Sequence, residues 1–300
     1  MSAAPLTAGP GAADPSVPAR AVRPRRARAV VPLSYLAALA ILAITLVPLL
    51  FIVIGGFRTT AQLNAAPAGL PHPWVLHNYQ SILASATFWQ NLANSAVIAV
   101  IATGLAVSLG AMAAFALARY SFRGREGWYT LFAIGLLFPA NVASLPIYLL
   151  LKQAGMLDSL LGVALPEAAF ALPFTIVILR PFMRAIPGEL QDAAMVDGAT
   201  RLRFFVRILL PLSRPALMTV SVLAFVTSWN AYLLPFLVFT SQSKFTLPLG
   251  VATFQSTYSQ DTAAIFAFTA LSMLPALGFF LLAQRRIVGG LSGLAGSIKG

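Results

Sequence analysis

Side chains that could perform acid–base, nucleophilic or metal chemistry are scarce in this sequence. Its 300 residues include eight Asp and Glu, two His and no Cys, which excludes a disulfide framework and a thiolate metal site. His72 and His77 have no carboxylate cluster nearby and are interpreted as solvated loop residues. The glycine-rich loop that cradles ATP phosphates, G-x-x-x-x-G-K-[ST], is absent. We therefore expect no catalytic residue, no bound metal and no cofactor.

Glu167 is an exception, because it lies inside a long apolar segment. A carboxylate within a membrane is costly and usually faces a cavity or a partner. A second interpretation places Glu167 near the outer membrane interface. Three other polar or amphipathic residues lie within apolar segments, where solute contact and hydrogen bonds between helices explain them equally well: Asn141, Trp229 and Asn230.

The most polar part of the ordered sequence is the stretch 184–214. Pro187 favours the start of a short helix, and Gly198 is well placed to end that helix in a left-handed conformation. Glu189 and Asp192 would then lie near its positive N-terminal end, where acidic side chains are stabilising.

A second short helix is predicted over residues 200–210, stopping at Pro211. The small side chains of Ala193 and Ala194 would allow another surface to approach the first helix closely. The stretch 184–214 is therefore expected to form a rigid helical projection. The same pattern also fits a helix that simply lies along a membrane interface.

The composition indicates a membrane protein. Hydrophobic residues make up 59% of the chain and charged residues 9%, and the mean hydropathy is +0.84. A soluble domain of this length needs more charge to cover its surface. A membrane-spanning helix needs about 20 mostly apolar residues. Six segments qualify and predict an all-α integral membrane domain over residues 30–288: 33–54, 94–118, 128–151, 160–179, 215–239 and 263–283. The prolines expected to kink these helices are Pro139, Pro146, Pro173, Pro235 and Pro275.

The basic residues predict the orientation of these six segments. Lys and Arg accumulate on the cytoplasmic side of membrane proteins. With both termini cytoplasmic, 17 of the 20 basic residues lie inside, and three lie outside: Arg58, Lys152 and Lys244. Short basic clusters between long uncharged stretches also argue against nucleic-acid binding, despite the net charge of +12. Residues 1–29 are predicted to be a disordered basic cytoplasmic tail and residues 289–300 a cytoplasmic C-terminal tail.

The stretch 184–214 resembles the EAA motif of ABC-importer permease subunits. Asp192-Ala193-Ala194, Gly198, Ile208 and the Leu-Pro pair that ends at Pro211 have the spacing of that motif, with Asp192 in place of its Glu. Further segments resemble the carbohydrate-uptake, maltose-type members of this family: Asn94-Ser95 with Ala118-Arg119, Phe138-Pro139 through Tyr148, Arg180 through Leu190, Trp229-Asn230, and Gln284 through Leu291.

This resemblance implies a type I ABC-importer permease fold in a bacterial cell membrane. It implies four kinds of contact: the lipid bilayer, a second homologous permease subunit, two ATPase subunits, and an extracytoplasmic sugar-binding protein. The chain itself would not hydrolyse ATP. The residues expected to couple to an ATPase are Glu189, Asp192, Ala193, Ala194, Asp197, Gly198, Ile208 and Pro211. Phe254 and Tyr258 are expected to contact the binding protein, and the candidates for the translocation pathway are Asn141, Glu167, Trp229 and Asn230.

Other functions remain open at this point. The cargo could be glycerol phosphate or another polar solute instead of a sugar. An ion-coupled secondary transporter would need buried charges, for which Glu167 alone is thin support. A membrane-embedded enzyme is disfavoured by the lack of catalytic clusters.

Overall fold

A computed structural model describes residues 30–254 and 260–296 of the chain. Within these ranges it consists of helices and loops, with no β-strand. The first part contains α1 (Val30–Gly55), α2 (Thr60–Ala65), α3 (His77–Ala84), α4 (Ala86–Arg119), α5 (Arg125–Gly135), α6 (Ala140–Gln153) and α7 (Leu160–Ala185). The second part contains α8 (Glu189–Val196), α9 (Arg201–Phe204), α10 (Leu210–Leu212), α11 (Arg214–Trp229), α12 (Leu233–Val238), α13 (Leu247–Gly250) and α14 (Thr262–Gly296). A π-helical turn, Phe205–Leu209, joins α9 to α10, and 3₁₀ turns form at Gln242–Lys244 and Val251–Phe254.

The chain divides into one unit that ends at Pro48 and another that begins at Leu49. Most of α1 belongs to the first unit, and its residues from Tyr35 onward are long and apolar enough to cross a membrane. In the second unit α4, α7 and the first part of α14, Thr262–Leu281, meet the same criteria. Two bent pairs of helices bring the number of spans to as many as six. The predicted all-α membrane architecture is therefore confirmed.

The third predicted segment is not one continuous helix. Helices α5 and α6 meet at an angle of 98°, whereas a kinked helix over residues 128–151 was expected. Pro139 lies at the break in an extended conformation and precedes the first residue of α6. Proline has no N–H to donate and its ring clashes with a preceding helical turn, so the helix is interrupted here and the chain turns through 98° instead of bending slightly.

The fifth predicted segment, 215–239, is also divided. Helix α11 ends at Trp229, and the Asn230 side chain donates a hydrogen bond of 2.8 Å to the Val226 carbonyl oxygen in the last turn. Side-chain groups that satisfy terminal carbonyls favour the end of a helix. Helix α12 begins four residues later, at Leu233, so this segment forms two helices.

The second short helix of the 184–214 stretch does not stop at Pro211 as predicted. The helical run Arg201–Leu212 passes through it and then meets α11 at 78°. Pro211 lies in the first turn of α10, where a missing backbone N–H is tolerated. The chain turns at Ser213, directly after this run.

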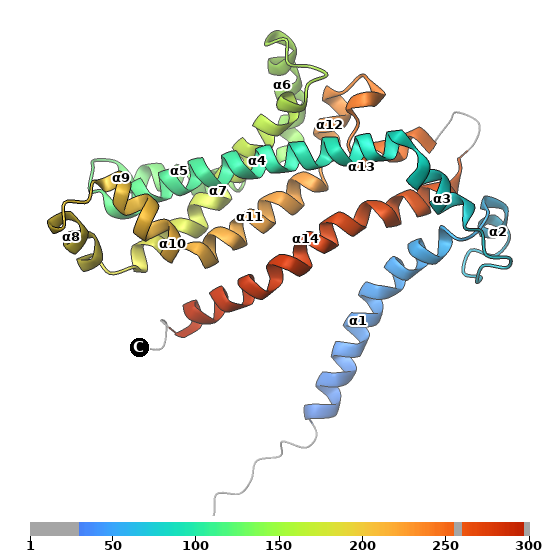
Figure 1. Cartoon of the computed structure of the whole chain (residues 1–300), viewed down its shortest axis with the longest axis horizontal. Helices are drawn as coiled ribbons and strands as arrows, with labels where there is room; N and C mark the ends of the chain where they lie inside the picture. Colours follow the sequence, from blue (N-terminus) through green and yellow to red (C-terminus); the bar gives the residue numbers. More distant parts are fainter. Residues whose placement is uncertain (1–29, 255–259, 297–300) are drawn as a thin grey trace, which may run out of the picture. The chain divides into compact units, whose positions relative to one another are not determined.

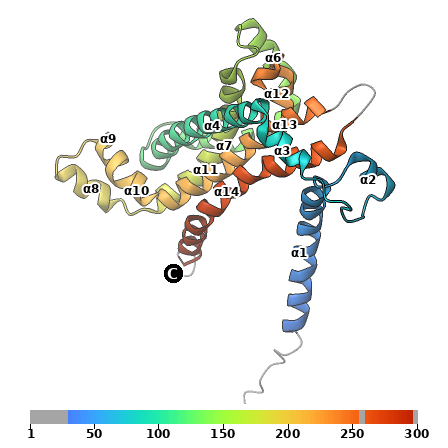
Figure 2. The same ribbon diagram turned by 45° about the vertical axis from the view of Figure 1, so that its right-hand side comes forward.

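Helix α4 is the centre of the second unit, and it packs lengthwise against α7 and α11 (Figures 1 and 2). Its buried face contains many small residues, including Ala99, Ala102 and Ala106. A Cβ atom added to Gly110 would lie 2.5 Å from Thr175 Cγ2 of α7. Small residues let membrane helices approach closely and gain van der Waals contact, so Gly110 fixes the closest approach of these two helices.

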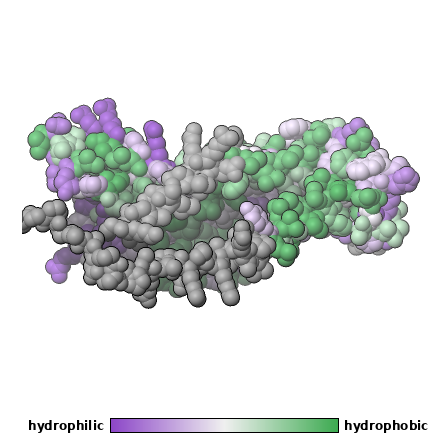
Figure 3. All heavy atoms as spheres, turned by 90° about the horizontal axis from the view of Figure 1, so that it is seen from below, coloured by the Kyte–Doolittle hydropathy of each residue, from purple (hydrophilic) through white to green (hydrophobic). Residues whose placement is uncertain are grey.

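Where the middle of the face in Figure 3 is coloured, its side chains are mostly hydrophobic, and hydrophilic side chains gather toward the two ends. One of these ends carries α8 to α10, and the opposite end carries α2 and α3 (Figures 1 and 3). An apolar middle with polar ends is the distribution that a lipid bilayer requires of a spanning protein.

Candidate functional site

Helix α8 ends as the glycine pattern predicts. Gly198 has φ +78°, in the left-handed region. The Gly198 N–H donates to the Met195 carbonyl at 3.1 Å, and the Ala199 N–H donates to the Ala194 carbonyl at 2.9 Å. These two bonds together form a Schellman motif, which satisfies the last carbonyls of the helix. The chain therefore leaves α8 in a fixed direction.

One side of α8 is buried and the other is exposed. Ala194 is 7% exposed and joins a core cluster with residues of α4, α7 and the 201–209 segment. The remaining predicted coupling residues of this helix and its end are exposed: Glu189, Asp192, Ala193, Asp197 and Gly198. Ile208 and Pro211 are partly buried beneath them. Val196 is 88% exposed, and the motif spacing gave no sign of this apolar side chain on the free surface.

Aromatic packing anchors α8 from below. Phe204 is fully buried, and Phe115 of α4 stacks on Phe205 with ring centroids 4.8 Å apart. Leu179 and Met183 of α7 belong to the same cluster. Burying aromatic side chains is among the largest stabilising contributions in a core. This cluster therefore stabilises the position of α8.

Hydrogen bonds tie the approach to α8 to the end of α4. The Arg119 Nη2 atom donates to the Ile186 carbonyl oxygen at 2.7 Å, directly before α8. Thr200 caps the helical run after α8, with its hydroxyl accepting the Arg203 N–H at 3.2 Å. The Arg201 guanidinium lies 5.0 Å from the centre of the Tyr120 ring, which is within the range of a cation–π contact. Both ends of α8 are thus held.

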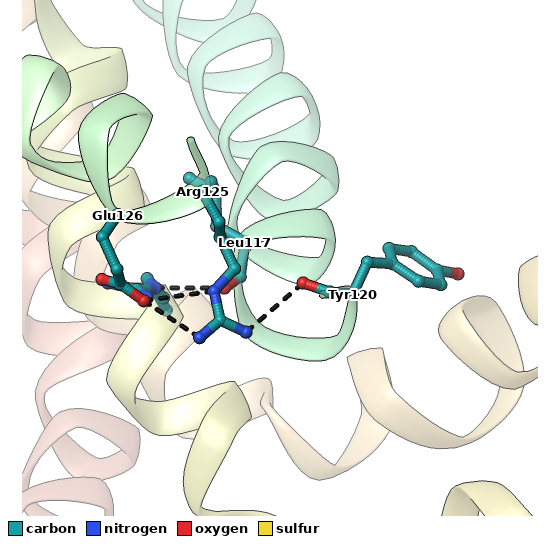
Figure 4. Close-up of polar contacts among 5 residues, drawn as sticks. Leu117, Tyr120, Arg125 and Glu126 are labelled. Atoms are coloured by element: carbon teal, nitrogen blue, oxygen red, sulfur yellow. Dashed lines mark hydrogen bonds and ion pairs between the residues drawn. The ribbon is translucent and has the colours of Figure 1, made fainter. Parts of the chain in front are cut away.

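Arg180 of α7 connects three helices at the same end. Its side chain is buried, and Nε donates to the Leu117 carbonyl oxygen of α4 at 3.1 Å. Its Nη2 atom lies 2.5 Å from Glu126 Oε1 of α5, and its guanidinium lies 4.0 Å from the centre of the Tyr129 ring. Figure 4 shows Glu126 beside Arg125, which also donates to the Tyr120 carbonyl at 3.3 Å.

We refer to α8 together with residues 115–126, 179–186 and 199–209 as the α8 end. The sequence predicted no contact for Arg119 or Arg180, which belong to the inside basic clusters and to segments that resemble the carbohydrate-uptake permeases. Their partners lie 67 and 63 residues away in the chain, and nothing in the spacing of the motif indicates such distant contacts.

A cavity of about 540 Å³ lies between α4, α5–α6, α7 and α11–α12 and is lined by Asn141 and Glu167. The Ser228 hydroxyl of α11 donates a hydrogen bond to Glu167 Oε2. Glu167 Oε1 is buried, and no partner lies within hydrogen-bond distance among the described residues. Glu167 carries the one carboxyl group among the described residues that line this space. We refer to it as the Glu167 cavity.

The other two pathway candidates lie elsewhere. Trp229 and Asn230 line a second space of about 460 Å³ between α11 and α14. Trp229 is 4% exposed, stacks on Phe225 and donates to the Ser272 carbonyl at 3.4 Å. Asn230 bonds to the last turn of its own helix. The structure thus brings Asn141 and Glu167 together and separates both from Trp229 and Asn230.

The loop residues have different environments. Phe254 is partly buried, with its ring centroid 5.3 Å from that of Phe268, while Tyr258 lies outside the described residues. His72 and His77 are exposed. Among the described residues no cluster of His, Asp and Glu could hold a metal ion.

Asp158, between α6 and α7, connects two loops at the end opposite α8. Its carboxylate accepts hydrogen bonds from the Thr240 and Ser241 N–H groups at 3.1 and 3.0 Å and from the Ser241 hydroxyl at 2.5 Å. The hydroxyl bond is the main reason that the pKa of Asp158 lies below its ordinary value. Hydrogen bonds to a carboxylate favour its charged form.

The fold is that of a type I ABC-importer permease. It is similar to a subunit in the crystal structure of a bacterial ABC transporter involved in the import of the acidic polysaccharide alginate, with a TM-score of 0.74. That likeness covers 88% of this chain and 99% of the other at 21% sequence identity, and at this identity it defines the architecture alone.

Residues 106–291 match the family described as binding-protein-dependent transport system inner membrane component, and the chain belongs to this family. It is 36% identical to the diacetylchitobiose uptake system permease protein NgcG of Streptomyces coelicolor, over 83% of each chain. It is 34% identical to the trehalose transport system permease protein SugB of Mycobacterium tuberculosis, over 85% of this chain and 93% of the relative. The chain is therefore a multi-pass membrane protein and a permease subunit of an ABC transporter.

Proposed function

We propose that this permease subunit imports a sugar and that α8 transmits the movement of an ATPase to the membrane helices. The names of the two relatives, which concern diacetylchitobiose and trehalose, support a sugar as cargo. The importer would contain this chain, a second homologous permease subunit and two separate ATPase subunits. An extracytoplasmic binding protein would deliver the sugar.

The observation that carries the coupling role is the two-sided character of α8. Its exposed side offers Asp192 and Ala193 to a partner, while Ala194 anchors the helix in the core shared by α4 and α7. Closure of the ATPase dimer on ATP would push this exposed side. Because α8 is held by packing and by the Arg119 bond to Ile186, the push would move α4 and α7 together. Interface-driven rigid-body motion is a known way to alternate access.

The role of the cavity follows from its composition and its place. It lies between the helices that α8 would move, and its polar lining includes the side chains of Asn141 and Glu167. We assign these two residues to the translocation pathway of this subunit. Trp229 and Asn230 are assigned to the packing of α11 and the end of that helix.

The charge distribution supports an orientation with both termini in the cytoplasm, because 17 of 20 basic residues then lie inside. A reporter enzyme active only outside the cytoplasm should be silent when fused after Gly300. The same reporter should be active when inserted near Ser243. The reverse pattern of activities would contradict this orientation.

Reconstitution in proteoliposomes tests the importer function. The purified chain should not hydrolyse ATP, because it has no phosphate-binding loop. Sugar-dependent ATP hydrolysis and uptake should appear when the second permease, the ATPase subunits and the loaded binding protein are added. Robust ATP hydrolysis by the chain alone, or no uptake by the complete set for any sugar that the binding protein holds, would contradict the proposal.

A further inference from the structure

The two oxygen atoms of Glu167 have different environments. Oε2 accepts the hydrogen bond from the Ser228 hydroxyl, and this contact between α7 and α11 fixes the direction of the carboxylate. Oε1 is buried with no donor within reach among the described residues. A buried polar atom without a partner is destabilising, because it has lost its hydrogen bonds to water and gained none in return. Such an atom at the wall of a cavity indicates that a donor arrives from outside the chain.

Neighbouring hydroxyl groups do not supply that donor. Ser144 donates to the Ala140 carbonyl at 3.2 Å, and Thr227 donates to the Leu223 carbonyl at 2.8 Å, each within its own helix. Both residues line the same space as Glu167. Their hydroxyl groups are therefore already committed, and Glu167 Oε1 is the strongest acceptor left in the cavity.

The remaining lining indicates the chemical class of the donor. The described lining contains no Lys, Arg or His to balance an anionic solute, and the carboxylate of Glu167 would repel one. Phe138, Phe170, Phe174 and Tyr232 contribute aromatic surface. A neutral sugar has hydroxyl groups that donate to a carboxylate and apolar C–H faces that pack on aromatic rings. A cavity of about 540 Å³ falls within the usual range for small-molecule sites of about 300–1,000 Å³.

We infer that the Glu167 cavity binds a neutral, hydroxyl-rich sugar during transport, with Glu167 Oε1 accepting a hydrogen bond from a sugar hydroxyl. Ser228 is a positioning residue that orients the carboxylate. This inference rests on the proposed function and extends it to the class of cargo. It disfavours phosphorylated solutes and acidic sugars as cargo.

The rival explanation is that Glu167 and Ser228 only join two helices. A hydrogen bond between membrane helices contributes to packing whether or not a solute is present. Glu167→Gln separates the two explanations, because its amide oxygen can still accept the Ser228 hydroxyl while the negative charge is lost. Ser221→Ala is the matched control for Ser228→Ala, because Ser221 lies on the same helix, bonds to the Leu217 carbonyl and does not line the cavity.

The experiment measures sugar binding to the membrane complex without its binding protein. Saturation-transfer NMR detects weak binding of trehalose or N,N′-diacetylchitobiose, whichever the binding protein holds, to the purified complex of both permeases and the ATPase subunits. Glu167→Gln should raise the dissociation constant by about tenfold, since hydrogen bonds to charged groups are worth at least this factor. Ser228→Ala should raise it less, and Ser221→Ala should leave it unchanged.

Two results would overturn the inference while leaving the importer function intact. One is a Glu167→Gln complex that binds the sugar with wild-type affinity, or a wild-type complex that binds no sugar, in preparations that still import the sugar. The other is equal binding of digalacturonic acid and the neutral disaccharide to the wild-type complex. If Glu167→Gln lowers the yield of assembled complex, as judged by ATPase co-purification, while the complex that does assemble binds the sugar with wild-type affinity, the helix-packing explanation is correct.

Discussion

The α8 end and the Glu167 cavity differ in whether their buried polar groups have hydrogen-bond partners. At the α8 end, the guanidinium groups of Arg119 and Arg180 donate hydrogen bonds to backbone carbonyls, and that of Arg180 also donates to Glu126. In the cavity, one buried oxygen of Glu167 has no hydrogen-bond donor in the part of the chain that the structure describes. The first arrangement connects segments more than 50 residues apart, whereas the second leaves a strong acceptor facing an open space.

This difference matches the two tasks of a transport subunit. A segment that transmits a push must not yield, and buried hydrogen bonds together with aromatic packing at the α8 end make it stiff. A segment that passes a solute must bind it weakly and release it, so its polar atoms have to be available to the solute. Substitutions at the α8 end should therefore change coupling to ATP, and substitutions in the cavity should change contact with the cargo.

The largest effect is expected at Gly198. Gly198→Val places a β-branched residue at φ +78°, a conformation that costs an L-residue about 1–2 kcal/mol or more. The Schellman motif that directs the chain out of α8 should be lost. We expect sugar uptake to be abolished while the protein still inserts in the membrane, as measured by uptake and ATPase co-purification. Wild-type levels of both would remove α8 from the coupling pathway.

Gly198→Asn is the matched control for this substitution. Asparagine tolerates the left-handed conformation better than most residues. Among the described residues, apart from its neighbours in the chain, no heavy atom lies within 4 Å of a Cβ built at Gly198. Uptake that survives in Gly198→Asn would assign the valine defect to backbone strain. Uptake that is lost in both variants would assign it to close approach of the ATPase.

Arg180→Ala is expected to have the next largest effect. It removes a buried guanidinium that joins α4, α5 and α7 and leaves the Leu117 carbonyl unpaired. We expect a loss of about 2 kcal/mol in stability, discounted for the exposed position of Glu126. The specific sign of a coupling role is a higher number of ATP molecules hydrolysed per sugar imported in proteoliposomes.

Arg180→Lys is the control for charge, because lysine keeps the charge but cannot donate in two directions with a rigid fork. A coupling ratio between the wild-type and alanine values is expected. If ATP hydrolysis and uptake fall in proportion in Arg180→Ala, the residue only stabilises the fold.

Local patterns predicted the local features of this molecule. Apolar segment length predicted six spans, where the structure has four continuous ones and up to six with the bent pairs. Gly198 indicated the end of α8. Both predictions depend on residues close together in the sequence. The 98° break at Pro139 was predicted only as a kink, since a proline shows where a helix is interrupted but not how far the chain turns.

Contacts between distant segments could not be predicted in the same way. Glu167 meets Ser228 from 61 residues away, and Arg180 meets Leu117 from 63 residues away. Helices that are apolar nearly all round give no periodic signal of which face meets which neighbour. For the same reason the sequence grouped Trp229 and Asn230 with Glu167, whereas they line a different space.

A moderate effect is expected at Asp192, which is exposed in the first turn of α8. Asp192→Ala removes a charge that the helix N-terminus stabilises by about 0.3–1 kcal/mol, so uptake should fall about two- to fivefold. Asp192→Glu retains the charge and should stay near wild type. Complete loss of uptake in Asp192→Ala would show that the carboxylate contacts the ATPase directly.

The smallest effect on transport is expected at Asp158, which belongs to neither region and therefore tests whether the comparison is specific. Its pKa is lowered in the folded protein by the Ser241 hydroxyl and by two backbone N–H groups. A lowered pKa means that these bonds stabilise the fold above the unfolded value of about 4 and that this contribution is lost as the pH falls through the lower folded value.

Asp158→Asn tolerates the positive φ of 53° at this position and has no charge to titrate. The melting temperature of the wild-type complex should therefore exceed that of Asp158→Asn at pH 7, and the difference should shrink as the pH falls below about 4. Uptake at pH 7 and the number of ATP molecules per sugar should be unchanged, so a changed coupling ratio would show that stiffness matters along the whole subunit and not only at the α8 end.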